Sequence, residues 1–236
     1  MVFRGQGILL DVEGTTSSIS FVYDVLFVFA RTHLAEFLLA HCDDQRVAKL
    51  AAQLAAEASL PDSSLKDPSA RAGIVAAALD LMNRDIKSTP LKALQGMIWR
   101  SGFESGELVA DVFSDVPVAL HAWADSGLDV RIYSSGSIEA QQLFFSHTCF
   151  GDLTPFLRGH YDTTTGHKRE AKSYATIAAQ MSLEPSEILF VSDIGGELDA
   201  ACAAGMMTCL IERPGNPPQE CLMGHATVQS FAEIIT

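Results

Sequence analysis

From residue 111 onward, short apolar segments alternate with segments of helical spacing, and this alternation restricts the fold to a narrow class. The apolar segments at 129–133, 188–191 and 208–211 are typical of buried strands. The spacing of apolar residues predicts helices in four stretches around them: 116–126, 138–146, 172–181 and 197–204. Strands and helices in alternation form a parallel sheet with covering helices, so we predict an α/β fold.

One more strand is predicted far upstream, at residues 7–10. Between it and the alternating part, residues 18–110 have helical spacing and almost no strand signal, apart from a predicted loop at 60–68. We therefore predict a core domain of residues 1–17 and 111–236, and an inserted helical domain of residues 18–110. Because the insertion leaves the sheet directly after its first strand, we expect it to act as a lid over the strand ends.

The acidic composition narrows the classes of partner. The 236 residues carry a formal net charge of −13, which argues against a broad basic surface for nucleic acid. The apolar run at 17–40 is interrupted by Asp24 and Arg31, and its uncharged stretch is too short for a membrane span. We expect no nucleic acid and no membrane as partners. A monomer is expected, because a capped core needs no second subunit to shield its site.

Cysteine usage indicates the compartment. The five cysteines form no close C-x-x-C pair: Cys42, Cys149, Cys202, Cys209 and Cys221. An odd number of widely spaced thiols is typical of a reduced, intracellular protein. The N-terminal residues also lack a basic region followed by a signal-peptide core. A cytoplasmic location is therefore expected.

Polar residues follow the predicted strands at their carboxyl ends, where open α/β sheets bind their ligands. Asp11 stands at the end of the first strand, and Glu13 comes two residues later. Two such carboxylates suit a nucleophile paired with an acid or base, or a metal site. The alternative is that these polar side chains only cap the next helix.

Ser134 and Ser135 follow the strand at 129–133 and precede a predicted helix. A hydroxyl group beside the unpaired N–H groups of a helix start can cradle a phosphate. An ordinary serine N-cap is the alternative reading of the same residues.

Two further residues lie in comparable places. Asp193 follows the strand at 188–191 and could join Asp11 on a hard cation such as Mg²⁺, or could cap the next helix together with Ser192. Lys168 precedes a predicted helix in a glycine-bearing loop, where an ammonium group can neutralise a carboxylate or a phosphate. A solvated loop lysine is the alternative, and Lys172 is a competing candidate.

In this order, the segments resemble the four motifs of the haloacid dehalogenase superfamily of phosphohydrolases. The chain resembles more specifically the enolase-phosphatases of methionine salvage, from about residue 7 to residue 216. The resemblance is carried by Leu10-Asp-Val-Glu-Gly-Thr-Thr16, Ile19-Ser-Phe-Val22, Leu94-Gln-Gly-Met-Ile-Trp99, Tyr133-Ser-Ser-Gly-Ser137, Ala140-Gln141, Gly151-Asp-Leu153, Tyr161-Asp-Thr163, Gly166-His-Lys168 and Arg213-Pro-Gly-Asn216. Glu13 stands where most of the superfamily has Asp, and it agrees with this family.

The resemblance implies a Rossmann-like core of the haloacid dehalogenase type with an inserted α-helical cap, and a Mg²⁺-dependent enzyme acting on a phosphorylated small molecule. The implied reaction enolises 2,3-diketo-5-methylthiopentyl-1-phosphate and then removes its phosphate. The product is the acireductone 1,2-dihydroxy-3-keto-5-methylthiopentene. Two other functions stay open: a generic Mg²⁺-dependent phosphomonoesterase of the same superfamily, and a catalytically idle binding or scaffold protein.

The resemblance also implies the role of each site residue. Asp11 would be a Mg²⁺ ligand and the nucleophile, Glu13 would bind the ion through its backbone carbonyl and transfer a proton, and Asp193 would complete the metal ligands. Ser134 and Ser135 would hold the phosphate, and Lys168 would contact the substrate. The residue that takes the enolisation proton is left open, with Glu36 and Glu104 as further candidates. The candidates for an apolar pocket around the methylthio group are Phe21, Trp99 and Phe103, and plain core packing is the alternative for each of them.

Overall fold

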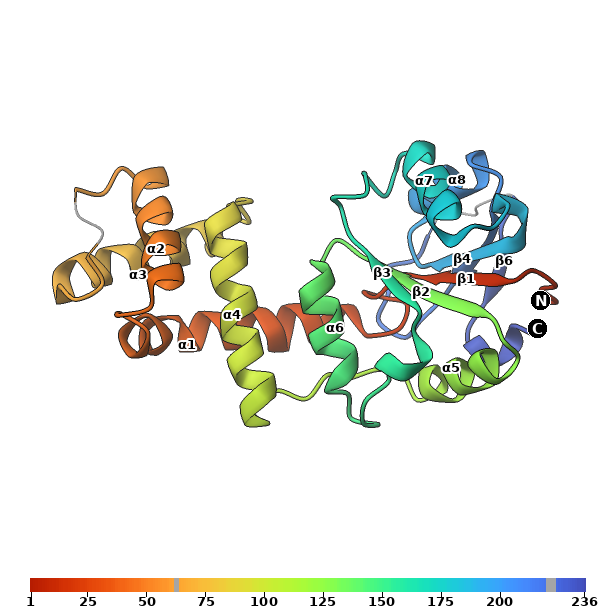
Figure 1. Cartoon of the computed structure of the whole chain (residues 1–236), viewed down its shortest axis with the longest axis horizontal. Coiled ribbons are helices and arrows are strands. Elements are labelled where there is room, and N and C mark those ends of the chain that lie inside the picture. The colour runs from red at the N-terminus through yellow and green to blue at the C-terminus, as the bar shows by residue number, and fades with distance from the viewer. Residues whose placement is uncertain (62–63, 220–223) are drawn as a thin grey trace. The chain divides into compact units, whose positions relative to one another are not determined.

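The computed structural model of the chain describes residues 1–61, 64–219 and 224–236. It divides into two compact units: Met1–Val22 together with Val109–Thr236 form the first, and Tyr23–Leu108 form the second. The first unit contains the sheet, and the second is helical (Figure 1). Each unit has a buried apolar cluster of its own.

Within the described residues, six strands form one parallel sheet in the order β3-β2-β1-β4-β5-β6. The strands are β1 Gly7–Leu10, β2 Asp129–Tyr133, β3 Gly159–Tyr161, β4 Ile188–Ser192, β5 Met207–Ile211 and β6 Ala226–Val228. The central strands β1 and β4 are buried along their whole length, which explains their uninterrupted apolar runs. The predicted α/β fold with a Rossmann-like parallel sheet is confirmed.

Helices cover both faces of this sheet. They are α5 Asp115–Asp125, α6 Ile138–Ser146, α7 Ala171–Met181 and α8 Gly195–Ala203. Helix α8 contacts β4, β5 and α7, whereas α5 contacts β2. Figure 1 shows α7 and α8 together on one side of the sheet and α5 on the other. The apolar cluster beneath α7 and α8 includes Tyr174, Phe190 and Leu198.

The second unit contains four α-helices in the part of the chain that the structure describes. They are α1 Phe27–Ala40, which a short π-helix at Phe21–Leu26 precedes, α2 Gln45–Glu57, α3 Pro68–Asn83 and α4 Thr89–Ser105. The side chains of Asp44, Asp67 and Ser88 accept backbone N–H groups at the starts of α2, α3 and α4. Gly106 ends α4 with a φ of 78°, a left-handed conformation that glycine adopts easily.

Some elements differ from the sequence prediction. Strands β3 and β6 are not predicted, because three residues are too short to show a periodic pattern. The spacing of Ile74, Ala78 and Leu81 predicts a helix over 70–87. The observed helix ends at Asn83, since Arg84 caps it and Asp85 takes a positive φ of 49°. Part of the loop predicted at 60–68 lies outside the described residues.

The chain leaves and re-enters the first unit at neighbouring points. Ser17 Oγ donates to the Asp111 carbonyl at 2.6 Å, and the N–H of Phe113 donates to the Thr16 carbonyl at 3.0 Å. These two bonds close the gap in the first unit where the helical segment is inserted.

No single helix in the described ranges is long and apolar enough to cross a membrane. Phe21–Ala40 and Gln45–Glu57 reach that length and composition only as a pair, with a bend of 119° between them. Helix α1 buries one apolar row in the second unit: Ala30, Leu34, Phe37 and Leu38.

The described cysteines Cys42, Cys149, Cys202 and Cys209 are free thiols. Cys221 lies outside the described residues.

Candidate active site

Three of the predicted site residues follow strands that are neighbours in the sheet. Asp11 follows β1, Ser134 follows β2, and Asp193 follows β4, with β1 between the other two strands. The register pairs Leu10 with both Ile132 and Val191, so the carboxyl ends of the three strands are level. The sheet therefore gathers these residues at the edge where α/β folds bind their ligands.

Lys168 is the centre of a buried cluster of charges. Its ammonium Nζ lies 2.6 Å from Asp11 Oδ1 and 2.7 Å from Glu197 Oε2. The hydroxyl of Ser192 lies 3.2 Å from Asp11 Oδ2 and 3.2 Å from Glu197 Oε2. Burial alone would lower the pKa of Lys168, but the charges of Asp11 and Glu197 outweigh it and hold that pKa well above its ordinary value. Lys168 is thus no solvated loop lysine, whereas Lys172 is exposed.

The backbone around Lys168 is held by three side-chain hydroxyl groups. Tyr133 donates to the carbonyl of Gly166 at 2.9 Å, and Tyr174 donates to the carbonyl of Lys168 at 2.6 Å. Ser173 donates to the carbonyl of His167 at 2.8 Å. Gly166 has a φ of 149°, and a Cβ atom there would clash with Ser173 Oγ. The conformation of this loop therefore requires glycine at position 166.

Asp193 is buried beside the same cluster. Its Oδ2 accepts a hydrogen bond from Asn216 Nδ2 at 3.1 Å, whereas its Oδ1 has no hydrogen-bond partner. Burial and the charge of Asp11 raise the pKa of Asp193 to about 7. The same two causes hold the pKa of Glu197 above its ordinary value, although Lys168 opposes them.

Whether these residues could bind a metal ion depends on whether only side chains or also other oxygen ligands are considered. In the described part of the chain, no group of three or more His, Cys, Asp or Glu side chains could hold a metal ion. Mg²⁺, however, commonly binds one or two carboxylates and completes its shell with other oxygens. Asp11 and Asp193 provide two carboxylates, and Asp193 Oδ1 is buried without a partner. Asp11, Asp193 and Glu197 place three largely buried carboxylates near one ammonium group, which pairs with only two of them. The residues present therefore fit a divalent cation.

Glu13 is half-buried in the turn that follows Asp11. The carbonyl of Val12 accepts the N–H groups of Thr15, Thr16 and Ser17 at 2.9 to 3.2 Å, and this closes the turn. Gly14 has a φ of 69°, and a Cβ atom there would clash with the Asp193 carboxylate. The cap of the next helical turn is Ser18, whose Oγ accepts the N–H of Phe21 at 3.1 Å. Asp11 and Glu13 therefore do not fill the capping role.

Ser134 is buried directly after β2, whereas Ser135 is exposed. The N–H of Gly136 donates to Ser134 Oγ at 3.1 Å. The N-cap of α6 is Ser137, whose Oγ accepts the N–H of Ala140 at 3.3 Å. Neither predicted serine is the helix cap.

Gln141 fastens this loop to the neighbouring strand. Its Nε2 donates to the carbonyl of Gly136 at 2.7 Å and to that of Tyr161 at 2.9 Å. Its Oε1 lies 3.2 Å from Nδ1 of His160. Burial lowers the pKa of His160 to about 4, so its ring is neutral at neutral pH.

The structure also brings in residues that the sequence pattern does not assign to the site. From the sequence alone, Glu197 suits either a supporting contact in the site or a solvated position on the first turn of a helix; the structure places it in contact with Lys168. The position of Glu197 on the first turn of the helix after Asp193 is the sequence feature that points to this contact. Ser192 ends β4, and its contact with Asp11 joins two segments that are distant in the sequence. The contact of Asn216 with Asp193 likewise has no local sequence signal.

The candidates from the inserted segment lie in ordinary surroundings. Glu36 is exposed, and Glu104 pairs with Arg100 at 3.3 Å on the surface. Among the apolar candidates, Trp99 Nε1 donates to the carbonyl of Leu26 at 2.7 Å, and Phe103 is buried in the second unit. Phe21 packs edge-on against Phe144 in the first unit.

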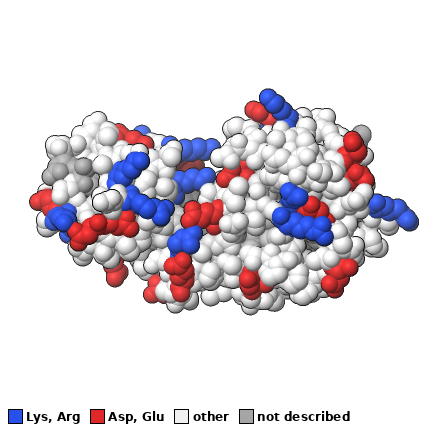
Figure 2. Space-filling view, viewed as in Figure 1, with Lys and Arg blue, Asp and Glu red and all other residues white. Residues whose placement is uncertain are grey.

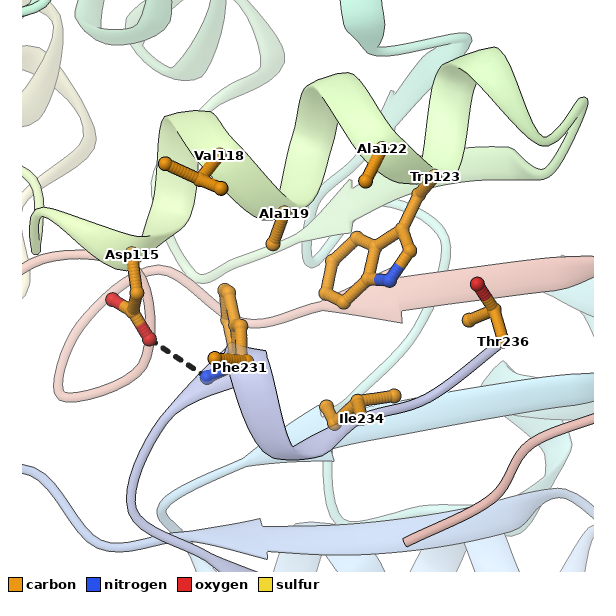
Figure 3. A pocket seen from close by; sticks show the side chains of 9 residues that line it. Asp115, Val118, Ala119, Ala122, Trp123, Phe231, Ile234 and Thr236 are labelled. Atoms are coloured by element: carbon orange, nitrogen blue, oxygen red, sulfur yellow. Dashed lines mark hydrogen bonds between the residues drawn. The ribbon is translucent and has the colours of Figure 1, made fainter.

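A cavity of about 390 Å³ lies elsewhere in the first unit, between α5 and the C-terminal residues (Figure 3). Its lining includes Val118, Trp123, Phe231 and Ile234, and none of the predicted site residues. Asp115 is at its rim, but that carboxylate already accepts bonds from Arg213, Ser230 and the N–H of Phe231.

Comparison with known proteins identifies full-length relatives. No protein-family model matches the chain. Enolase-phosphatase E1 of Pseudomonas aeruginosa (strain UCBPP-PA14) is 46% identical over 230 residues, which cover 98% of each chain. Enolase-phosphatase E1 of Pseudomonas syringae pv. tomato is 45% identical over 229 residues, covering 97% of this chain and 96% of the relative. Enolase-phosphatase E1 of Sorangium cellulosum is 44% identical over 229 residues, covering 97% of both.

Solved structures share the fold of this chain. The UTR4 protein of Saccharomyces cerevisiae is 32% identical, with a TM-score of 0.80 over 96% of this chain and 98% of that one. YfnB of Bacillus subtilis, a HAD-hydrolase bound to magnesium, is 13% identical, with a TM-score of 0.61 over 98% of this chain and 96% of that one. At that identity, the second likeness shows the fold alone.

Proposed function

This chain belongs to the enolase-phosphatase E1 family, and from that premise we infer that it is the enolase-phosphatase of methionine salvage. The observation that supports this inference is an identity of 44–46% with curated members of that family over nearly the whole chain. The reaction would enolise 2,3-diketo-5-methylthiopentyl-1-phosphate and hydrolyse its phosphate ester. The products would be 1,2-dihydroxy-3-keto-5-methylthiopentene and inorganic phosphate.

We assign the attack on phosphorus to Asp11. The new bond from its carboxylate to phosphorus forms as the ester P–O bond breaks, and water then hydrolyses the aspartyl phosphate to release inorganic phosphate. A carboxylate that approaches an anionic phosphate is repelled unless nearby charges neutralise the pair. The Lys168 ammonium, 2.6 Å from Asp11 Oδ1, supplies one such charge, and it would also contact the substrate. Glu197 keeps that ammonium oriented from the other side at 2.7 Å.

We propose that Asp11, Asp193 and the backbone carbonyl of Glu13 hold Mg²⁺. Support comes from the unpartnered Asp193 Oδ1 and from the excess of buried carboxylates over cations. When bound, the ion supplies Lewis-acid polarisation of the substrate oxygens and offsets phosphate charge. We assign a proton transfer to the side chain of Glu13.

The loop after β2 is the proposed phosphate-binding element. Ser134 and Ser135 would hold the phosphate through their hydroxyl groups and the N–H groups that precede α6, because helix starts present unpaired donors. The support is their place beside Asp11 at the same edge of the sheet.

We further propose that the sheet domain is the phosphohydrolase core, expected from the sequence at 1–17 and 111–236, and that residues 18–110 form the inserted cap. A monomer in the cytoplasm is proposed from the sequence pattern of the thiols and from the capped core. Nucleic acid is not a proposed partner: in the view of Figure 2, Lys and Arg are interspersed with Asp and Glu, and the net charge is −13.

The deciding experiment mixes the protein, Mg²⁺ and the diketo-phosphate while ultraviolet absorbance and phosphate release are followed together. We expect a transient enol, then acireductone with phosphate. The substitution Asp11→Asn is expected to slow phosphate release by about three orders of magnitude or more. The matched control Asp125→Asn, exposed at the end of α5, is expected to keep the wild-type rate.

Two other results would replace the proposal. Phosphate release from simple esters without any enol from the diketone would indicate a generic phosphomonoesterase. A folded protein that turns over neither substrate would indicate a binding or scaffold protein.

A further inference from the structure

We propose that Asn216 is a positioning residue that holds Asp193 and the turn after Asp11 in the arrangement that binds the cation. Asn216 touches neither reacting atoms nor, in this assignment, the ion itself. That the bound cation is Mg²⁺ rests on the proposed function.

One amide group joins the two loops that carry the proposed ligands. Asn216 Nδ2 donates to the carbonyl of Gly14 at 2.8 Å and to Asp193 Oδ2 at 3.1 Å. The first acceptor is next to Glu13, in the turn after β1, and the second follows β4. Residues that orient metal ligands through such hydrogen bonds commonly set the affinity for the ion.

The bond to Asp193 also selects which oxygen of that carboxylate is free to bind. Oδ2 is occupied by Asn216, and Oδ1 is buried without a partner. The Oδ1 of Asn216 is likewise buried without a partner. Buried polar atoms are nearly always hydrogen-bonded. Two buried oxygens without a partner, in side chains that are hydrogen-bonded to each other, are therefore a second sign of a ligand site. A hydrated divalent cation offers a positive charge to the carboxylate and O–H donors to the amide.

Asn216 is itself fixed by a buried arginine in the same turn. Its N–H donates to the carbonyl of Arg213 at 3.1 Å. Arg213 Nε donates to the carbonyl of Thr15 at 3.0 Å, and its guanidinium pairs with Asp115 at 2.8 Å. The turn at 213–216 thereby holds two consecutive carbonyls after Asp11, with Asn216 on the side that faces Asp193.

The space around this contact leaves little room for another arrangement. A Cβ atom at Gly14 would lie 3.0 Å from Asn216 Nδ2 and would clash with Asp193. The backbone of the turn, the amide and the carboxylate are therefore in mutual contact, and removal of the amide frees both neighbours.

The test is the Mg²⁺ affinity of Asn216→Ala, measured by calorimetric titration of metal-free protein. We expect a Kd higher than wild type by about 10- to 100-fold. The turnover number should recover when Mg²⁺ is raised to saturation. The control Pro217→Ala changes the exposed residue directly after this turn and should leave the Kd unchanged. Melting temperatures in chelator give the structural effect of each substitution separately.

Equal Mg²⁺ affinity in Asn216→Ala and wild type would overturn the assignment, even with a lower melting temperature, because a purely structural residue changes stability alone. Wild-type protein that binds neither Mg²⁺ nor Mn²⁺ would overturn it as well. Should Asn216→Ala fail to fold, Asn216→Ser replaces it in the same titration. Wild-type protein that binds Mg²⁺ but leaves the diketo-phosphate unchanged would refute the proposed function, while the comparison of Kd values still decides the role of Asn216.

Discussion

Lys168 carries its charge where burial opposes it, and its two carboxylate partners keep it charged. Asp11 and Glu197 lie 2.6 and 2.7 Å from its Nζ, and all three side chains are nearly inaccessible to solvent. A buried ion pair adds little net stability, but loss of one partner leaves an uncompensated charge. The cluster is therefore sensitive to the identity of each of its members.

Replacement of Lys168 by Met is expected to lower the free energy of unfolding by about 3–5 kcal/mol at neutral pH. Two carboxylates then lose their shared cation. Urea unfolding measures the change. The control Lys172→Met alters an exposed lysine nearby and should shift stability by less than about 0.5 kcal/mol. Similar losses in the two variants would contradict the buried pairing.

His160 makes stability depend on pH. Its folded-state pKa of about 4 lies below its ordinary value of 6.5, so below about pH 6.5 the unfolded chain binds a proton that the folded chain refuses. The free energy of unfolding therefore falls as the pH drops from about 6.5 towards about 4. In His160→Gln this loss is absent, and between about pH 7 and pH 5 we expect the stability difference from wild type to change by about 1 kcal/mol in favour of the variant. Urea unfolding at both pH values tests this, and a pH-independent difference would refute it.

At the scale of elements, the sequence predicts what depends on local pattern. The buried runs of β1 and β4 and the helices α6 and α7 match the expected ranges to within one residue. The residues Asp11 and Asp193 follow from the rule that parallel strands end at one edge. Strands β3 and β6 carry too few residues for a pattern.

The contacts of the site could not be predicted in the same way. Glu197 pairs with Lys168 because α7 and α8 lie side by side, and Asn216 meets Gly14 across some two hundred residues of sequence. No local spacing encodes either contact. The catalytic and metal-binding roles of the strand-end residues remain predictions that kinetics and titration must test.

The loop before α7 requires glycine at 166. Gly166→Ala is expected to displace the backbone that carries Lys168, because the new Cβ atom would clash with Ser173 and the φ of 149° is unfavourable for alanine. We expect phosphate release to fall by at least about tenfold. Gly127→Ala is the control, since its φ of 82° imposes similar strain but nothing lies near the new atom. It should cost about 1–2 kcal/mol of stability and leave the rate intact; an equal loss of rate in both would contradict this account.

The start of α6 separates a capping serine from a proposed binding serine. Ser137→Ala removes the bond to Ala140 and should cost about 1 kcal/mol of stability, with an unchanged KM. Ser134→Ala should raise the KM for the phosphorylated substrate by about tenfold, the equivalent of one charge-assisted hydrogen bond. Steady-state kinetics with thermal unfolding distinguish the two, and a raised KM for Ser137→Ala alone would reverse the assignment.

At the scale of the whole molecule, each unit buries its own apolar residues. The cluster of the helical unit includes Leu34, Leu54 and Leu94, and that of the sheet unit includes Leu9, Tyr174 and Phe190. Each cluster draws its members from within one unit. Local unfolding free energies can therefore differ between them.

Leu54→Ala is expected to destabilise the helical unit by about 2–5 kcal/mol, since it removes a fully buried side chain. Hydrogen exchange followed by mass spectrometry should show faster exchange in Tyr23–Leu108 and unchanged exchange in the strands of the first unit. The reciprocal substitution Leu9→Ala should accelerate exchange in the sheet. Uniform acceleration through the whole chain in either variant would show that the units unfold together.

The place of β1 in the sheet has a consequence for biosynthesis. This strand is made first, yet its partners are β2 and β4, and Leu10 pairs with Val191. At about 5–20 residues per second, roughly 10 to 40 s separate the synthesis of these two residues on the ribosome. The complete helical segment is made before β2, and during that time the apolar strand Gly7–Leu10 has no strand to pair with. Nascent chains should therefore expose the apolar segment Gly7–Leu10 to chaperones until β2 is made, and one edge of this strand stays unpaired until β4 is made.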